Sequence, residues 1–180
     1  MTGTDTQARS VYMWVREGTW RATVDAALNL VPAGSMFTLL HVTSDEVPDA
    51  AHGAYAGLFG RAGRDPGSRL EEMAATSAGE LLAAAAGRLG RPCERVEVQG
   101  RAERAVVAAS AQADLLIVAR DGDRTRLGPK SLGKTTRFVV DHAPCPVLLV
   151  WPGSAPDVAT IPPPPHHPSP PPHHPSPPGH

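Results

Sequence analysis

The sequence has few aromatic residues, few cysteines and no excess of charge of either sign. Aromatic residues make up 4% of the 180 positions, and two cysteines, Cys93 and Cys145, are too few for a disulfide framework. The 17 Lys and Arg residues nearly balance the 18 Asp and Glu residues, which excludes a generally basic nucleic-acid binder and an acidic solvating chain. The chain lacks the run of about 18 apolar residues that a transmembrane helix needs. Residues 1–10 are polar and do not resemble a signal peptide, so we expect a cytoplasmic protein with no nucleic-acid or membrane partner.

Proline and histidine gather at the C-terminal end. Most of the 20 prolines lie in residues 152–180, where Asp157 is the only charged residue. Proline cannot extend a helix or a strand ladder, so we expect this segment to be a disordered tail. Its paired histidines lack a cysteine or carboxylate to complete a metal cage, and we assign no metal site and expect the fold to need no metal. Docking of the tail on a protein partner, weak metal binding and the absence of any ligand remain alternatives.

Residues 10–151 alternate between strand and helix patterns and are long enough for one independent domain. The sequence predicts strands over 10–15, 36–42, 95–98, 114–119 and 146–151, and helices over 19–31, 68–89, 102–113 and 133–142. In the helix 68–89, Ser68 and Glu71 suggest a capping box, and Leu70, Met73, Ser77 and Leu81 recur on one face. Residues 43–67 have no clear period and predict a long loop, with a helical turn near 54–59. This alternation predicts an α/β fold with a mostly parallel sheet covered on both faces and a ligand crevice at the carboxyl ends of the strands.

The loop after the fourth expected strand combines glycines with phosphate-binding side chains. Ala119 ends the strand, Gly122 follows it, and Gly133-Lys134-Thr135-Thr136 opens the last helix. Glycine lets backbone N–H groups approach an anion, and a helix N-terminus adds free N–H groups and a positive dipole end. The loop therefore predicts a phosphate cradle.

The octapeptide Gly128–Thr135 within this loop matches the Walker A pattern. A true phosphate loop directly follows its strand, however, and here eight residues separate the strand from Gly128. One expected strand remains downstream, too little chain for the other segments of an NTPase. A P-loop-like NTPase is therefore the least favoured alternative.

Residues 113–151, and above all Arg137–Val150, resemble the universal stress protein family, and the likeness extends over residues 10–151. The resemblance implies a five-stranded Rossmann-like domain, usually a homodimer, and in some members an ATP or AMP ligand. Gly122 and Gly133 match glycines of the family's nucleotide motif, whereas Ala119 replaces its first glycine and the spacer has ten residues in place of nine. Lys134 replaces the Ser or Thr of that motif, although Thr135 follows.

The same resemblance places three residues near the adenosine. Glu17 stands in place of an acid that meets the adenosine, and Val42 and Val118 occupy positions that flank the adenine. We expect a regulatory module in stress response that binds ATP or AMP and has no catalytic residue. A nucleotide-independent dimeric interaction module that docks through its tail is the alternative. In either case we expect a homodimer formed through the last strand, Val147–Val150, if that strand lies at the sheet edge.

Overall fold

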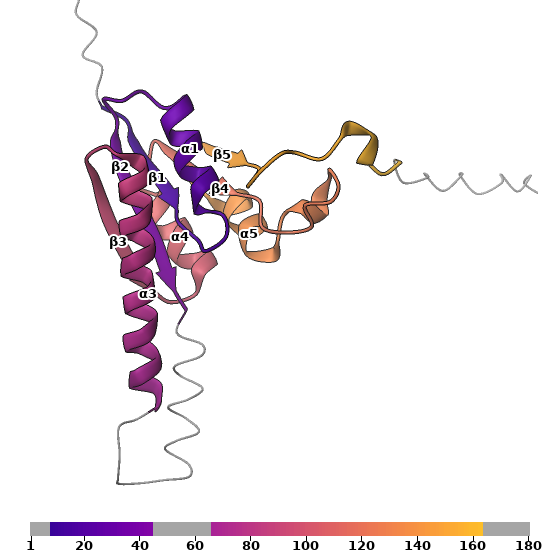
Figure 1. Cartoon of the computed structure of the whole chain (residues 1–180). Helices are drawn as coiled ribbons and strands as arrows, with labels where there is room; N and C mark the ends of the chain where they lie inside the picture. Colours follow the sequence, from indigo (N-terminus) through magenta and orange to yellow (C-terminus); the bar gives the residue numbers. More distant parts are fainter. Residues whose placement is uncertain (1–7, 45–65, 164–180) are drawn as a thin grey trace, which may run out of the picture.

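The structure, a computed structural model, describes residues 8–44 and 66–163 (Figure 1). Most of the predicted loop 43–67, including the turn expected near 54–59, lies outside the described residues, as does the tail segment 164–180. All nine expected strands and helices are present, with ends that differ by up to three residues. The strands are β1 Ser10–Trp14, β2 Met36–Thr43, β3 Cys93–Gln99, β4 Leu115–Ala119 and β5 Val147–Val150. The helices are α1 Trp20–Leu30, α3 Pro66–Leu89, α4 Ala102–Ser110 and α5 Lys134–His142, with short 3-10 turns at Pro129–Ser131 and Val158–Thr160.

The five strands form one parallel sheet in the order β3-β2-β1-β4-β5. The predicted Rossmann-like α/β fold is therefore confirmed, and β5 lies at an edge of the sheet, as expected. The strand order reverses between β1 and β4, since β1 pairs with β2 on one side and with β4 on the other. In parallel sheets of this kind, the crevice at such a reversal is where ligands usually bind.

Helices cover both faces of the sheet (Figure 1), because alternate strand residues point to opposite sides. Val11, Met13 and Val15 are fully buried against α1 and α3, in a cluster that also contains Leu39 and Ile117. On the opposite face a second cluster forms against α4 and α5; its buried members are Trp14, Leu40, Val106, Leu116, Val118 and Val139. These two cores fix the strand ends that carry the candidate site.

Helix α3 buries a different face from the one that the sequence predicts. Ala78, Leu82, Ala85 and Leu89 are buried, whereas Met73 is 70% exposed. Ser77 is also exposed and Leu81 only half-buried. The N-terminal part of α3 projects beyond the carboxyl ends of the strands (Figure 1), so the sheet does not cover Met73. Further along, small alanines let the helix lie close to the sheet.

The start of α3 also differs from the prediction. The helix begins at Pro66, so Ser68 lies inside the first turn and not at the position that precedes the helix. Proline suits the first turn of a helix, because its fixed φ is already helical and its missing N–H would have no partner there. The predicted capping box is therefore wrong.

The ordered chain continues past the predicted domain boundary at Trp151. Residues 152–163 have a described conformation and include the 3-10 turn Val158–Thr160. The Leu127 N–H donates to the Thr160 hydroxyl at 3.0 Å, and a Cβ on Gly128 would lie 3.8 Å from Pro162. The segment after β5 therefore packs on the loop between β4 and α5.

Candidate functional site

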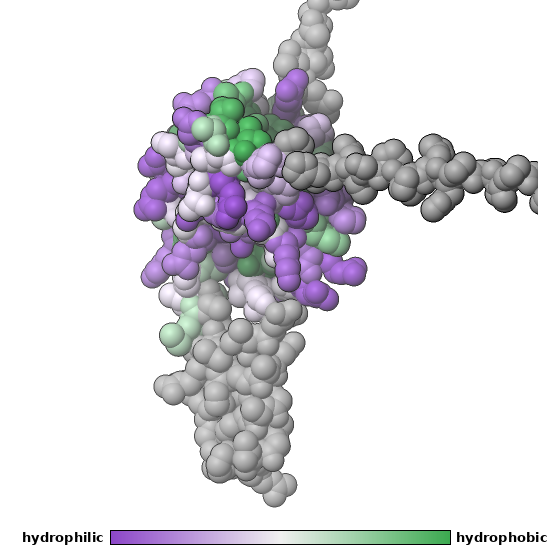
Figure 2. All heavy atoms as spheres, turned by 90° about the vertical axis from the view of Figure 1, so that its right-hand side faces the viewer, coloured by the Kyte–Doolittle hydropathy of each residue, from purple (hydrophilic) through white to green (hydrophobic). Residues whose placement is uncertain are grey.

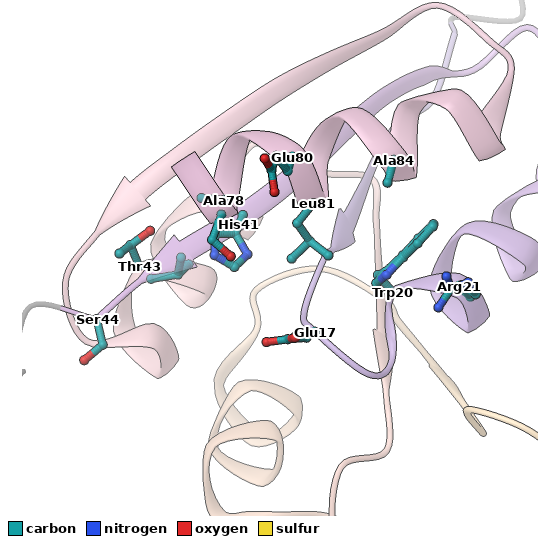
Figure 3. A pocket seen from close by; sticks show the side chains of 12 residues that line it. Glu17, Trp20, Arg21, His41, Thr43, Ser44, Ala78, Glu80, Leu81 and Ala84 are labelled. Carbon is teal, nitrogen blue, oxygen red and sulfur yellow. The ribbon is translucent and has the colours of Figure 1, made fainter. Parts of the chain in front are cut away.

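A cavity of about 560 Å³ lies at the carboxyl ends of β1 and β2, beneath α3 (Figure 3). The turn after β1, the end of β2 and the middle of α3 each contribute part of its lining. The lining residues are Glu17, Trp20, Arg21, His41, Val42, Thr43, Ser44, Ser77, Ala78, Glu80, Leu81 and Ala84. Its volume lies within the range of small-molecule sites.

The cavity combines apolar surface with a few polar groups. Val42 and Leu81 are half-buried and supply apolar surface, and Glu17 is exposed and supplies a carboxylate. Figure 3 shows Glu17, His41 and Leu81 gathered around the same space. The His41 Nδ1 lies 2.8 Å from the Val15 carbonyl oxygen, which fixes the ring orientation. Apolar surface together with a few polar groups is typical of sites that hold small organic ligands.

A second cluster lies at the reversal between β1 and β4 and centres on the Asp121 carboxylate. The Arg16 guanidinium, from the turn after β1, contacts Asp121 at 2.5 Å. The Gly133 N–H, at the start of α5, donates to Asp121 Oδ1 at 2.8 Å. Arg16 also contacts the Thr136 hydroxyl at 3.3 Å and stacks on Trp14 at 4.6 Å. The loop predicted to cradle a phosphate therefore surrounds a carboxylate of the same chain.

The ionisation of Asp121 follows from these contacts. Burial by itself raises the pKa of this carboxyl, but hydrogen bonds from Arg16, the Gly133 N–H and Thr136 outweigh it, so the pKa lies below its ordinary value. The Asp121 side chain is only 13% exposed. At neutral pH the start of α5 therefore holds an ionised internal anion.

The loop that carries Asp121 closes on itself through backbone contacts. The Gly122 N–H donates to Ser131 O at 3.0 Å, and the Asp123 N–H donates to Lys130 O at 2.8 Å. A Cβ on Gly122 would lie 2.3 Å from Lys130 O, so this close approach requires glycine.

The Walker-like octapeptide does not form a phosphate loop. Pro129–Ser131 is a 3-10 turn, and the Ser131 and Leu132 N–H groups donate to Gly128 O and Pro129 O. The Gly133 N–H is occupied by Asp121. A phosphate loop instead turns successive N–H groups toward one anion.

The nine predicted nucleotide-binding residues do not share one cavity. Glu17 and Val42 line the cavity at β1 and β2. Val118, Ala119 and Thr136 are buried. Lys134 and Thr135 line a separate hollow with Arg101, Glu103 and Phe138. Gly122 and Gly133 pack against their own loop.

Sequence analysis did not assign a role to Arg16, Asp121 or His41 in the site. Arg16 and Asp121 follow β1 and β4, and knowledge that these two strands are neighbours would have brought the two side chains together. The signal for His41 was its position near the carboxyl end of β2.

The comparison with protein-family models identifies the chain. The model of the universal stress protein family matches residues 17–150. The chain belongs to this family. A search of curated proteins gives no match.

Several solved structures, two of them described as universal stress proteins, share the fold. A universal stress protein solved in complex with cAMP is 18% identical, with a TM-score of 0.53, over 82% of this chain and all of that one (100%). A family protein from Arabidopsis thaliana with AMP bound is 17% identical, with a TM-score of 0.52, over 86% of this chain and 95% of that one. A hypothetical protein from a structural-genomics test case is 17% identical, with a TM-score of 0.59, over 82% of this chain and 98% of that one. At these identities the likeness establishes the fold alone.

The described part of this universal stress protein was also searched for metal sites, membrane-spanning helices and reactive thiols. Within residues 8–44 and 66–163, no cluster of three histidine, cysteine or acidic side chains is placed to hold a metal ion. In the same ranges no helix has both the length and the apolar character to cross a bilayer. Burial raises the pKa of both the Cys93 and Cys145 thiols, which disfavours the reactive thiolate.

Proposed function

We propose that this universal stress protein is a cytoplasmic regulatory module that binds an adenine nucleoside or nucleotide in the cavity at β1 and β2. The observation that carries the proposal is that Glu17 and Val42 both line the same cavity of about 560 Å³. An ionised carboxylate in such a position can accept hydrogen bonds from ribose hydroxyls. The AMP and cAMP complexes of two family members support this ligand class.

Each end of the ligand has a matching surface in this proposal. The adenine ring packs on Val42 and Leu81, and the ribose hydroxyls donate to Glu17. His41 is held by the Val15 carbonyl and turns its second ring nitrogen to the ligand. None of these groups is arranged as a nucleophile with a base, so we propose binding as a signal and no turnover.

Calorimetric titration with adenosine, AMP, cAMP and ATP tests the proposal. Glu17→Ala should weaken binding of the preferred ligand by about tenfold or more, because it removes hydrogen bonds to a charged acceptor. Glu94→Ala is the matched control, since Glu94 is an exposed carboxylate on β3 outside the cavity. The proposal is wrong if no member of the panel binds, or if both variants weaken binding equally.

We also propose that the protein is a homodimer formed through β5. This strand lies at the sheet edge, and all four of its residues are only half-buried. Figure 2 views the molecule from the side on which β5 and the C-terminal segment lie, and hydrophobic residues gather in one patch there. Pairing with a second copy would cover the free backbone groups of the edge. A monomer in light scattering at micromolar concentration would contradict this assembly.

A nucleotide-independent interaction module is the second candidate. The Asp121 carboxylate at the start of α5 favours it, because an internal anion already satisfies that part of the fold. In this case the nucleotide panel gives no binding. Removal of residues 152–180 then abolishes capture of the partner, whereas removal has no effect if the tail is inert.

A further inference from the structure

The ion pair between Arg16 and Asp121 closes the crevice at the reversal of strand order. Arg16 follows β1 and Asp121 follows β4, and their side chains meet at 2.5 Å across the gap between these two strands. Arg16 directly precedes Glu17, which lines the cavity at β1 and β2, so the turn after β1 links the ion pair to the cavity.

The Asp121 carboxylate also accepts hydrogen bonds from the groups that would otherwise donate to a phosphate at this position. The Gly133 N–H, the Arg16 guanidinium and the Thr136 hydroxyl surround its carboxylate. A Cβ on Gly133 would lie 2.8 Å from Asp121 Oδ1, so the carboxylate rests directly against the start of the helix. A phosphate chain and this carboxylate cannot share the same donors, and their like charges repel.

The charged side chains that line the cavity also disfavour a chain of phosphates. Among the described residues that line it are the carboxylates Glu17 and Glu80 and the guanidinium of Arg21, which stacks on Trp20 at 4.6 Å. A triphosphate would bring several negative charges beside these acids, whereas a ribose brings hydroxyl donors that suit them. The cavity therefore favours a ligand of low charge.

We propose that Asp121 is a specificity-determining residue that restricts the ligand to nucleosides and nucleoside monophosphates by occupying the place of a longer phosphate chain. The inference rests on the proposed function, because it concerns the ligand of the same cavity. In this proposal the Asp121 carboxylate lies where the distal phosphates of a longer nucleotide would bind. The protein then reports on AMP-like ligands even where ATP is abundant.

Titration of the full chain with adenosine, AMP, ADP and ATP tests this selectivity. The unmodified protein should bind AMP at least about tenfold more tightly than ATP, since like charges at close range disfavour binding strongly. Asp121→Asn removes the charge and keeps the shape, and Asp121→Ala also opens the space. Both should reduce the AMP-to-ATP preference by about tenfold, mainly through tighter binding of ATP. Asp123→Asn is the matched control, because Asp123 carries the same charge in the same loop, but its carboxylate contacts Thr125 and Arg126 and not the start of α5.

Equal affinity of the unmodified protein for AMP and ATP would overturn the inference, as would an unchanged preference in both Asp121 variants. If no nucleotide binds to any protein, the proposed function fails, and a separate measurement decides the role of Asp121. The Gly133 amide resonance is followed by NMR while inorganic pyrophosphate is added. A shift in the Asp121 variants alone supports occupation of an anion site by this carboxylate. The absence of a shift in those variants overturns it.

Discussion

Substitution of Gly122 by alanine tests the tight closure of the loop between β4 and α5. An added Cβ would lie 2.3 Å from Lys130 O, 2.8 Å from the Ser131 carbonyl carbon and 2.9 Å from the Leu132 carbonyl carbon. All three are backbone atoms, so no side chain can rotate away. Relief of the clash has to separate the two backbone segments and weaken the bonds from the Gly122 and Asp123 N–H groups.

The cost follows from these contacts. Overpacking of a tight site costs roughly 1–3 kcal/mol, and each weakened hydrogen bond adds about 1 kcal/mol. We expect Gly122→Ala to lower the free energy of unfolding by about 2–4 kcal/mol. In a domain of this size, that loss lowers the Tm by roughly 5–15 °C. Thermal unfolding followed by circular dichroism and urea unfolding both measure it.

Gly87→Ala provides the matched control. Gly87 is exposed within α3, and an added Cβ would meet nothing within 4 Å. Alanine in a helix interior is favoured over glycine by about 1 kcal/mol, so this variant should be slightly more stable than the unmodified protein. If Gly122→Ala unfolds at the temperature of the unmodified protein, the close approach of the two segments is not as described.

Three further substitutions test the core, the internal anion and a surface ion pair. Val118→Ala should lower the free energy of unfolding by roughly 2 kcal/mol, because Val118 is fully buried. Urea unfolding measures this loss. A variant that loses ligand affinity but keeps its stability would contradict a structural role for Val118. The folded-state pKa of Asp121 lies below its ordinary value, so the carboxylate stabilises the fold above about pH 4 and this contribution is lost as the pH falls further. Asp121→Asn should therefore be less stable at neutral pH and lose less stability on acidification, in urea unfolding from about pH 3 to pH 7; parallel pH profiles would refute the internal ion pair. Arg88→Ala removes the bidentate contact to Asp25, whose side chain is 41% exposed, and should change the stability only slightly, and less at high salt than at low salt; a large loss of stability in urea unfolding would show that the pair is not an ordinary surface contact.

The order of strands and helices was predictable because its signals are local. The apolar runs of β1, β4 and β5 and the periodicity of α1 depend on neighbours in sequence alone. The buried face of α3 was not predictable in this way. Two stripes of apolar residues compete along this alanine-rich helix, and the extent of the sheet beneath it decides which one is covered.

The candidate site was predictable in part. The sequence located Glu17 and Val42 at the ends of the first two strands, and both line the cavity. It also identified Gly122 and Gly133 as positions where the backbone approaches a ligand anion, whereas in the structure they lie against the chain's own Lys130–Leu132 backbone and the Asp121 carboxylate. The partner of these glycines could not be foreseen, because a sequence shows the donors of an anion site but not which acceptor fills it. Here the acceptor is Asp121, twelve positions before Gly133.

The parallel pairing of β1 with β4 has a consequence for the order of folding. Ser10 and Asp114, which bond at 2.8 Å where this pairing begins, are 104 positions apart. During synthesis, β2 emerges soon after β1, but the other side of β1 stays unpaired until most of the chain has left the ribosome. Such distant pairings form slowly, and an open strand edge invites association with other chains. The nascent protein is therefore most vulnerable to aggregation before β4 emerges, and chaperone contact at that stage would protect the centre of the sheet.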